Sequence, residues 1–245
     1  SADLDLHYAS MLASKRVDGI VLVPTADPEE LLEAMDREHI PVVVTERETM
    51  SATCVVVDAV ATGRLATRHL LDLGHSRIAF LREHRSSLDS WRRFEGYRDT
   101  LAEAGISFDA SLVTEAAPNI DGGSIVEASR LAANTLLDAV PRPTAVFAHN
   151  DLIALAVVQE ARRRGLDVPS ELSVIGVDNA EAGRYANPTL TTVAFPSREL
   201  GRAAARLLLG STDSRSQSAL TVIAPGEVLA RDSTAPPPRD NNGHT

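Results

Sequence analysis

The stretch "TAVFAHNDLIALAVVQEARRRGLDVPSELSVIGV", residues 144–177, decides the fold class. It starts with a short apolar run typical of a buried strand, continues with an amphipathic run that predicts a helix over 151–165, and ends in a second β-rich run at 172–177. This order predicts two parallel strands joined by a crossover helix. The polar triplet His149-Asn150-Asp151 lies at the seam, where it either caps the helix or faces a binding site.

The same alternation extends along the rest of the chain and predicts an α/β fold with parallel sheets and helices on both faces. Further strands are expected at 17–23, 41–45, 54–58, 77–81, 220–224 and 226–230, and further helices at 27–40, 61–74, 89–105, 124–139 and 197–210. Residues 211–218 are predicted to form a polar surface loop, and the segment from Ala235 onward a disordered tail.

Composition excludes several classes of protein. With 44% hydrophobic residues in 245, the chain can bury a substantial core, and no apolar run reaches the roughly 20 residues that span a bilayer. The net charge of −10 argues against binding of nucleic acid by these 245 residues alone, because contacts to phosphates need a positively charged surface. Cys54 is the only cysteine, which excludes an internal disulfide. We find no nucleophile elbow, phosphate-binding loop, dinucleotide fingerprint or zinc motif, so neither catalysis nor a cofactor is indicated.

Polar side chains fall at the ends of several predicted strands. They are Glu46-Arg47, Asp58, His149-Asn150-Asp151 and Asp178-Asn179. Each group alone is explained by helix capping or turn formation. Together they favour a polar binding cleft, because ligands of open α/β sheets bind outside the carboxyl ends of the strands. Carboxylates and amides without a reactive nucleophile suit recognition of a polyhydroxyl ligand.

Six segments, in order, resemble the lactose-repressor (LacI/GalR) family of transcription factors. They are "RVDGIVLVP", "ATRHLLDLGHSRIAFL", "RRFEGYRDTLAEAGI", the stretch from "PTAVFAHND" to "SVIGVDN", "NPTLTTVAFPSRELGRAA" and "GEVLARDSTAPP". The resemblance implies a periplasmic-binding-protein-like type I fold, with two doubly wound parallel-sheet subdomains joined by three crossover strands. On this basis we expect an N-terminal subdomain of residues 1–82 plus 194–218, a C-terminal subdomain of 83–193 plus 219–235, and a disordered tail at 236–245.

The resemblance also implies three effector contacts. Arg93, four positions before the aromatic of "RRFEGY", matches an arginine that reaches the ligand's hydroxyls. Asn150 matches an asparagine that hydrogen-bonds them, with Asp151 expected to cap the helix. Asp178 matches the accepting carboxylate. Spacing alone favours a different role for Arg93, namely a helix-surface ion pair with Asp89.

Four further residues are candidate ligand contacts, each with an alternative. Trp91, the single tryptophan, either stacks on a sugar ring or packs a hinge. Phe147 and Phe195 alternate with core positions, which favours packing. Asp58 follows a strand, but this chain has Asp58-Ala59 where family members often have Asp-Asn, and Phe195 where they have Gln. The identity of the effector is therefore open, and His149 has no assigned role.

The resemblance implies a cytoplasmic homodimer that binds a small sugar-like effector and contacts operator DNA through a helix-turn-helix domain missing from this stretch. Residues 1–16 resemble the helix just before "RVDGI", so the core's own opening strand, helix and second strand are absent as well. We therefore expect this chain to be part of a longer one.

Two other functions compete with this reading. A secreted, monomeric sugar-binding transport receptor has the same fold, but "LGHSRIAFL", "PTLTTV" and "ARDSTAPP" resemble the repressor branch. A hydrolase on this fold lacks any catalytic constellation. No membrane interaction is indicated.

Overall fold

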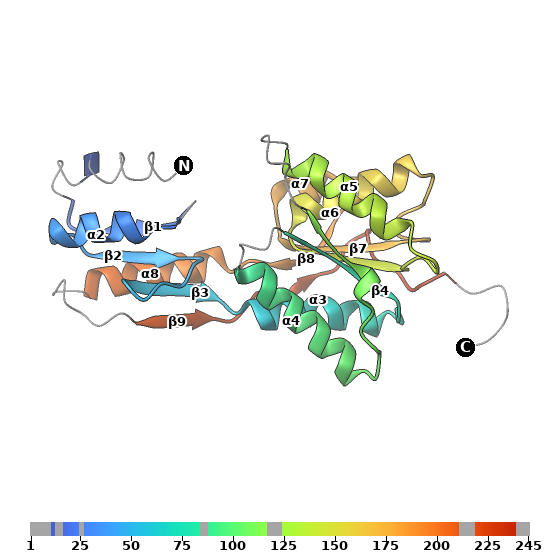
Figure 1. Cartoon of the computed structure of the whole chain (residues 1–245), viewed down its shortest axis with the longest axis horizontal. Helices are drawn as coiled ribbons and strands as arrows, with labels where there is room; N and C mark the ends of the chain where they lie inside the picture. The colour runs from blue at the N-terminus through green and yellow to red at the C-terminus, as the bar shows by residue number, and fades with distance from the viewer. Residues whose placement is uncertain are drawn as a thin grey trace. The chain divides into compact units, whose positions relative to one another are not determined.

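The computed structural model describes residues 11–12, 17–24, 27–83, 88–116, 124–210 and 219–238 (Figure 1). Its elements are β1 (Ile20–Leu22), α2 (Glu29–Arg37), β2 (Val42–Thr45), β3 (Thr53–Val57), α3 (Ala59–Asp72), β4 (Ile78–Glu83), α4 (Leu88–Glu103), the 3₁₀ helix η1 (Ala110–Leu112), β5 (Val113–Ala116), α5 (Ile125–Leu137), β6 (Ala145–Ala148), α6 (Asp151–Arg163), β7 (Ser173–Asp178), α7 (Glu181–Tyr185), β8 (Thr191–Ala194), α8 (Ser197–Gly210), β9 (Leu220–Ile223) and β10 (Val228–Leu229). The expected loop at 211–218 and most of the expected helix over 1–16 lie outside the described residues.

The chain divides into two compact units. Unit 1 comprises residues 1–58 and 196–224, and unit 2 comprises 59–195 and 225–245. The chain therefore passes between the units three times, as the three expected crossovers require. The boundaries differ from those predicted, which lay after residues 82, 193 and 218. β4 belongs to unit 2 because it pairs with β5 and β6, and β9 belongs to unit 1 because it pairs with β3.

Unit 1 is built on a four-stranded parallel sheet in the order β1-β2-β3-β9. Helix α2 packs Leu31 and Met35 against Ile20 and Val42, and a neighbouring cluster joins Leu32 to Val44 and Cys54. Helix α8 packs against β1, β2 and β3. The two edge strands keep apolar side chains exposed, since Val21 on β1 and Leu220 and Val222 on β9 are each about half accessible.

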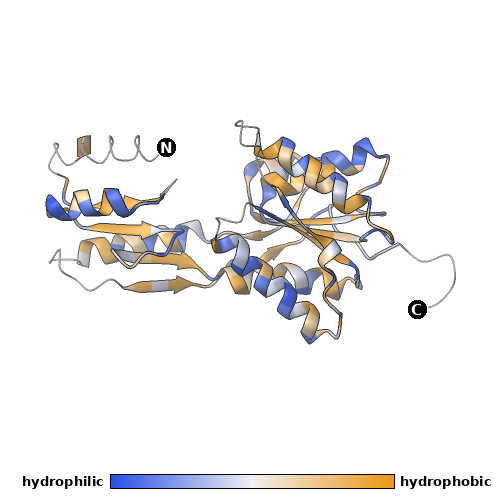
Figure 2. Cartoon of the chain, viewed as in Figure 1, coloured by the Kyte–Doolittle hydropathy of each residue, from blue (hydrophilic) through white to orange (hydrophobic). Residues whose placement is uncertain are grey.

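Unit 2 is built on a six-stranded sheet in the order β10-β8-β7-β6-β4-β5. All neighbouring strands run parallel except β10, which pairs antiparallel with β8. Helices cover both faces: α5 and α6 lie on one, α3 and α4 on the other (Figure 1). The hydropathy colouring agrees, because the strands are largely apolar whereas the helices alternate apolar and polar stripes (Figure 2).

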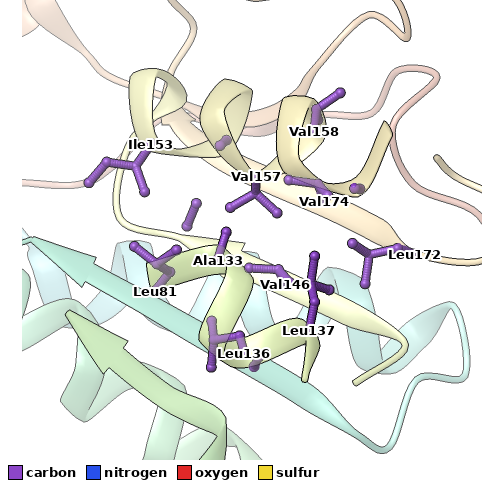
Figure 3. Packing of buried hydrophobic residues seen from close by; sticks show 14 of the residues in the cluster. Leu81, Ala133, Leu136, Leu137, Val146, Ile153, Val157, Val158, Leu172 and Val174 are labelled. Carbon is purple, nitrogen blue, oxygen red and sulfur yellow. The ribbon is translucent and has the colours of Figure 1, made fainter. Parts of the chain in front are cut away.

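Alternation along the strands of unit 2 separates two hydrophobic clusters. On the α5/α6 face, Val146 and Val174 meet Leu136 and Val157 (Figure 3). On the α3/α4 face, an aromatic cluster includes Phe80, Phe94, Tyr97 and Phe147. The buried Tyr97 hydroxyl donates to the Ile78 carbonyl at 2.8 Å, so the only polar atom of the Tyr97 side chain is hydrogen-bonded.

The predicted α/β class with helices on both faces of a parallel sheet is confirmed. The quoted stretch forms β6, α6 and β7 as predicted, with β6 and β7 paired in parallel. Prediction missed β5, β8 and the five-residue α7. The expected disorder from Ala235 onward is wrong at its first residue, because Ala235 exchanges hydrogen bonds with Ser173 at 2.9 and 3.0 Å. Residues 239–245 lie outside the described part of the chain.

Candidate functional site

The carboxyl ends of three neighbouring parallel strands gather the polar residues of unit 2. β4 ends at Glu83, β6 leads directly into His149 and Asn150, and β7 ends at Asp178. Because β4, β6 and β7 are adjacent in the sheet, these residues lie along one edge of it. This is the edge at which open α/β sheets bind their ligands.

Asn150 is the residue that caps α6. Its backbone is extended, with φ −144° and ψ 175°, and its Oδ1 accepts a hydrogen bond from the Ile153 amide at 2.9 Å. The prediction that Asp151 caps this helix is therefore wrong. Both residue types cap helices well, and here the cap falls one position earlier than predicted. The Asn150 side chain is partly exposed, and capping uses its oxygen, which leaves the amide NH₂ as the group able to donate to a ligand.

Asp151 is fully buried and joins three segments of the unit. Its Oδ1 accepts from the Thr192 hydroxyl at 2.7 Å, and its Oδ2 accepts from the Ala180 amide at 2.7 Å. Burial raises the pKa of Asp151 to about 6, although these hydrogen bonds act in the opposite direction. The carboxylate therefore fixes the start of α6 to β8 and to the turn that follows β7.

The turn after β7 presents Asp178 in an unusual backbone conformation. Asp178 has φ 116° and Asn179 has φ 59°, values that most residues with a side chain avoid. Two hydrogen bonds hold the turn. The Arg231 guanidinium donates to the side-chain oxygen Oδ1 of Asn179 at 2.6 Å, and the backbone amide of Asn179 donates to Thr192 Oγ1 at 3.2 Å. The Asp178 side chain itself is exposed, as a carboxylate that receives a ligand must be.

Arg93 lies on α4 and is buried, which rules out the helix-surface position that its spacing favoured. Its Nη1 donates to the backbone carbonyl of His149 at 2.6 Å. This bond draws the guanidinium to the end of β6, next to Asn150. The structure thus brings together two of the three predicted effector contacts, with the third, Asp178, at the end of the neighbouring strand β7.

His149 and Glu83 are the residues of this edge that the sequence analysis did not assign. His149 Nε2 lies 3.1 Å from Glu83 Oε2, and the imidazole is buried. Burial and the nearby Arg93 guanidinium lower the pKa of His149 to about 4, so the ring is neutral at pH 7. The available signal was position alone: His149 directly follows a buried run that was predicted as a strand, and Glu83 lies two residues beyond the predicted strand at 77–81.

Trp91 lies on α4 and is half exposed, with 47% of its surface accessible. Its ring is 5.4 Å from that of Phe94, and the Arg82 guanidinium sits 5.5 Å from the ring centroid. Arg82 also pairs with Glu115 at 2.8 Å. One face of the indole is therefore occupied by the protein, while part of the side chain stays accessible.

The remaining candidates are placed differently. Phe147 is fully buried and packs edge-on against Phe80, with ring centroids 4.9 Å apart, so its role is in the core. Phe195 is partly buried at the end of unit 2. Asp58 belongs to unit 1, where its amide donates to the Ile223 carbonyl at 2.8 Å.

Among the described residues, no group of three or more His, Cys, Asp or Glu is arranged to hold a metal ion. No helix in this part of the chain is long and apolar enough to cross a membrane.

Comparisons with known proteins give one consistent result. Residues 67–234 match the model of the periplasmic binding protein-like domain. The chain is 36% identical over 237 residues to the HTH-type transcriptional regulator DegA of Bacillus subtilis, covering 95% of this chain and 68% of DegA. It is 37% identical over 205 residues to the HTH-type transcriptional repressor PurR of Vibrio atlanticus, covering 82% of this chain and 60% of PurR.

Solved structures agree with the curated relatives. A complex of the transcriptional regulator CelR with cellobiose has a TM-score of 0.81 at 29% identity, covering 95% of this chain and 71% of that one. A LacI family transcriptional regulator from Enterococcus faecium with bound ribose has a TM-score of 0.79 at 27% identity, covering 95% of this chain and 85% of that one. The relatives are regulators, in line with the expectation that the chain is not an enzyme.

Proposed function

The chain belongs to the LacI family of transcriptional regulators, and from that premise we propose that it is the effector-binding part of a DNA-binding regulator. The observation that carries the proposal is the convergence of Arg93, Asn150 and Asp178 on one sheet edge of unit 2. The chain spans 60–68% of the length of the two curated relatives, so the activity of a whole protein is part of the proposal.

The chemistry of this edge supports a polyhydroxyl effector. Arg93 and the Asn150 amide are donors, and the exposed Asp178 carboxylate is an acceptor, which together match the donor and acceptor capacity of sugar hydroxyls. Both ligands named in the neighbouring structures, cellobiose and ribose, are sugars. We therefore propose a small sugar or sugar derivative, with Trp91 and Phe195 as further contacts and Phe147 as part of the core.

Regulation follows from differential affinity. An effector that binds one conformation of the protein more tightly shifts the population toward it, by no more than that difference in affinity. We propose that a homodimer passes this shift to operator DNA in the cytoplasm. The DNA contacts would come from a helix-turn-helix domain of the kind named in the relatives. A concentration-independent monomer in sedimentation equilibrium would contradict the dimer.

A transport receptor of the same fold is less well supported, because the relatives reported above are regulators. The two functions also differ in what the effector must do. A receptor needs only to bind its sugar, whereas a regulator must change its affinity for DNA when the sugar binds.

Isothermal titration calorimetry with D-ribose and cellobiose tests the binding proposal. Asp178→Asn keeps the shape of the side chain and tolerates the left-handed backbone, but it removes the charge. We expect it to weaken sugar binding at least tenfold without changing the thermal midpoint. Asp36→Asn, at an exposed position of α2, is the matched control and should bind as the wild type does. If Asp178→Asn binds both sugars with the affinity of the wild type, the Asp178 carboxylate does not contact the sugar.

A further inference from the structure

His149 occupies a position that the proposed function has not used. It follows the last residue of β6, and its backbone amide donates to the Leu81 carbonyl at 2.8 Å, which extends the β6–β4 pairing by one residue. The alternation of the strand places its side chain on the same face as Phe147, the face that α4 covers. Only 5% of His149 is exposed. The imidazole is therefore held inside the protein at the edge where Arg93 donates to the His149 carbonyl, next to Asn150.

Glu83 determines which ring nitrogen carries the proton. The Glu83 carboxylate, 3.1 Å from His149 Nε2, can only accept a hydrogen bond, so Nε2 must be the donor. Arg93 Nη1 is 3.4 Å from the same Nε2, but its short bond goes to the His149 carbonyl at 2.6 Å. A neutral imidazole with its proton on Nε2 has an unprotonated Nδ1. Nδ1 is therefore a hydrogen-bond acceptor.

This acceptor lacks a partner in the described part of the chain. His149 Nδ1 is buried, and no donor among the described residues lies within hydrogen-bonding distance and geometry. Native proteins pair nearly all of their buried polar atoms, and an exception at a binding edge points to a ligand group. The neighbouring Arg93 guanidinium can supply only donors to a ligand, and the Asn150 oxygen already accepts from the Ile153 amide, so Nδ1 adds a buried acceptor beside them.

We propose that His149 is a specificity-determining residue of the effector site, whose Nδ1 accepts a hydrogen bond from a hydroxyl or N–H group of the effector. The inference rests on the proposed function and deepens it. Glu83 acts through His149 as a positioning residue, because its carboxylate holds the tautomer that leaves Nδ1 able to accept. The site then selects effectors that donate at this point over analogues in which the donor is missing or methylated.

Two substitutions separate this role from a structural one. In His149→Asn, the amide oxygen takes the place of Nδ1 while the contact to Glu83 is lost. In His149→Gln, the amide nitrogen takes the place of Nε2 and keeps the contact to Glu83, but nothing replaces Nδ1. We expect His149→Asn to be less stable than the wild type yet to retain its affinity for D-ribose or cellobiose. We expect His149→Gln to be close to wild type in stability but to bind about 3- to 10-fold more weakly.

The opposite pattern would overturn the inference. If His149 only bridges Glu83 and α4, His149→Gln keeps sugar affinity and His149→Asn loses it. Calorimetry measures the affinities and urea unfolding the stabilities, so the two effects are read separately. A methylated form of the bound sugar gives a second check, since blocking the donating hydroxyl should weaken binding to the wild type and leave His149→Gln unaffected.

A measurement without sugar distinguishes failure of this inference from failure of the proposed function. Nitrogen-15 NMR of the histidine rings at pH 7, with His149 assigned from the His149→Asn spectrum, reports which nitrogen is protonated. We expect the proton on Nε2 in the wild type and a loss of this preference in Glu83→Gln. A proton on Nδ1 would overturn the inference. If the wild type binds neither sugar, the proposed effector class fails, and the tautomer still decides whether His149 offers an acceptor.

Discussion

Asn150 shows how one side chain can serve folding and binding at the same time. Its oxygen is committed to the Ile153 amide, which is one of the donors that the first turn of α6 leaves unpaired. Its NH₂ group is then oriented by the cap, so the helix start positions the donor that the site requires. A substitution at this position changes stability and affinity together unless it keeps the cap.

Two substitutions of Asn150 separate the cap from the ligand contact. Asn150→Ala removes both, and we expect a loss of about 1 kcal/mol in the free energy of unfolding, together with weaker sugar binding. Asn150→Asp keeps the capping oxygen, and its charge suits a helix N-terminus, so its stability should match the wild type. Its affinity should fall, because a carboxylate cannot donate. Urea unfolding and calorimetry measure the two quantities. Wild-type affinity in Asn150→Asp would mean that the amide contacts no ligand.

Asp151 gives a prediction with a defined pH dependence. Its pKa is raised to about 6 in the folded protein, against an ordinary value of 3.8. A raised pKa means that this group's contribution to stability is fully present below about pH 4 and is lost as the pH rises through about 6. The difference in unfolding free energy between wild type and Asp151→Asn should therefore be larger at pH 4 than at pH 7, by at most about 3 kcal/mol.

Urea unfolding of both proteins between pH 4 and 7 measures this difference directly. Contributions of other titrating groups cancel in the comparison. A difference that stays constant with pH would show that Asp151 titrates normally in the folded protein.

The candidate site could be located from the sequence, but the roles within it could not be assigned. The polar residues after the strands at Ala148 and Val177 lie along one edge of the sheet, as predicted, because parallel strands share their carboxyl ends. Asn150 caps the helix, whereas Asp151 accepts a hydrogen bond from Thr192. Thr192 is 41 residues from Asp151 in the sequence, so no local pattern could predict which of the two residues takes which role. The position of Arg93 depends likewise on the His149 carbonyl, 56 residues away, to which it donates.

At the scale of the elements, α3 and α4 approach unusually closely through two glycines. A Cβ atom on Gly96 would lie 2.1 Å from the Val60 carbonyl oxygen, and one on Gly63 would lie 2.2 Å from that of Arg93. Backbone therefore packs against backbone at this crossing, where no side chain can be accommodated. Because α4 carries Arg93 and Trp91, this contact also sets the position of two candidate site residues.

We predict that Gly96→Ala destabilises the protein by roughly 1–3 kcal/mol or more, because the added methyl group forces the two helices apart. Gly201→Ala in α8 is the matched control, since nothing lies within 4 Å of the added Cβ. There, alanine should raise stability by up to about 1 kcal/mol through its better helix propensity. Thermal unfolding of both variants measures the contrast. A mild effect of Gly96→Ala would mean that the α3–α4 contact adjusts at little cost.

The elements that the sequence predicted share a strong periodic signal, and those that it missed do not. Helices α5 and α6 and strands β6 and β7 each bury a clear apolar pattern. β5 (Val113–Ala116) is a four-residue edge strand carrying Thr and Glu, and α7 is five residues long with a central glycine. Such short elements are held by their neighbours: β5 by its pairing with β4, and α7 by the hydrogen bond from the Leu190 amide to the Gly183 carbonyl at 2.8 Å.

At the scale of the whole molecule, the two units are protected from solvent very differently. In unit 2, β6 and β7 are central strands, with helices on both faces and nearly every residue buried. In unit 1, β1 and β9 are the edges of a smaller sheet, and β9 leaves Leu220 and Val222 more than half exposed, at 53% and 54%. Strands with few buried contacts open at low free-energy cost, whereas central strands exchange only in large-scale unfolding.

Native-state hydrogen exchange should therefore resolve two levels of protection. We expect amides of β6 and β7 to exchange slowest and those of β1 and β9 to exchange orders of magnitude faster, with low concentrations of urea accelerating unit 1 first. Gly96→Ala should accelerate exchange in unit 2 and leave β1 and β9 unchanged, because the altered contact lies wholly in unit 2. If both units instead lose protection together, the three connecting segments must couple their folding, and a substitution in either unit would change the stability of the other.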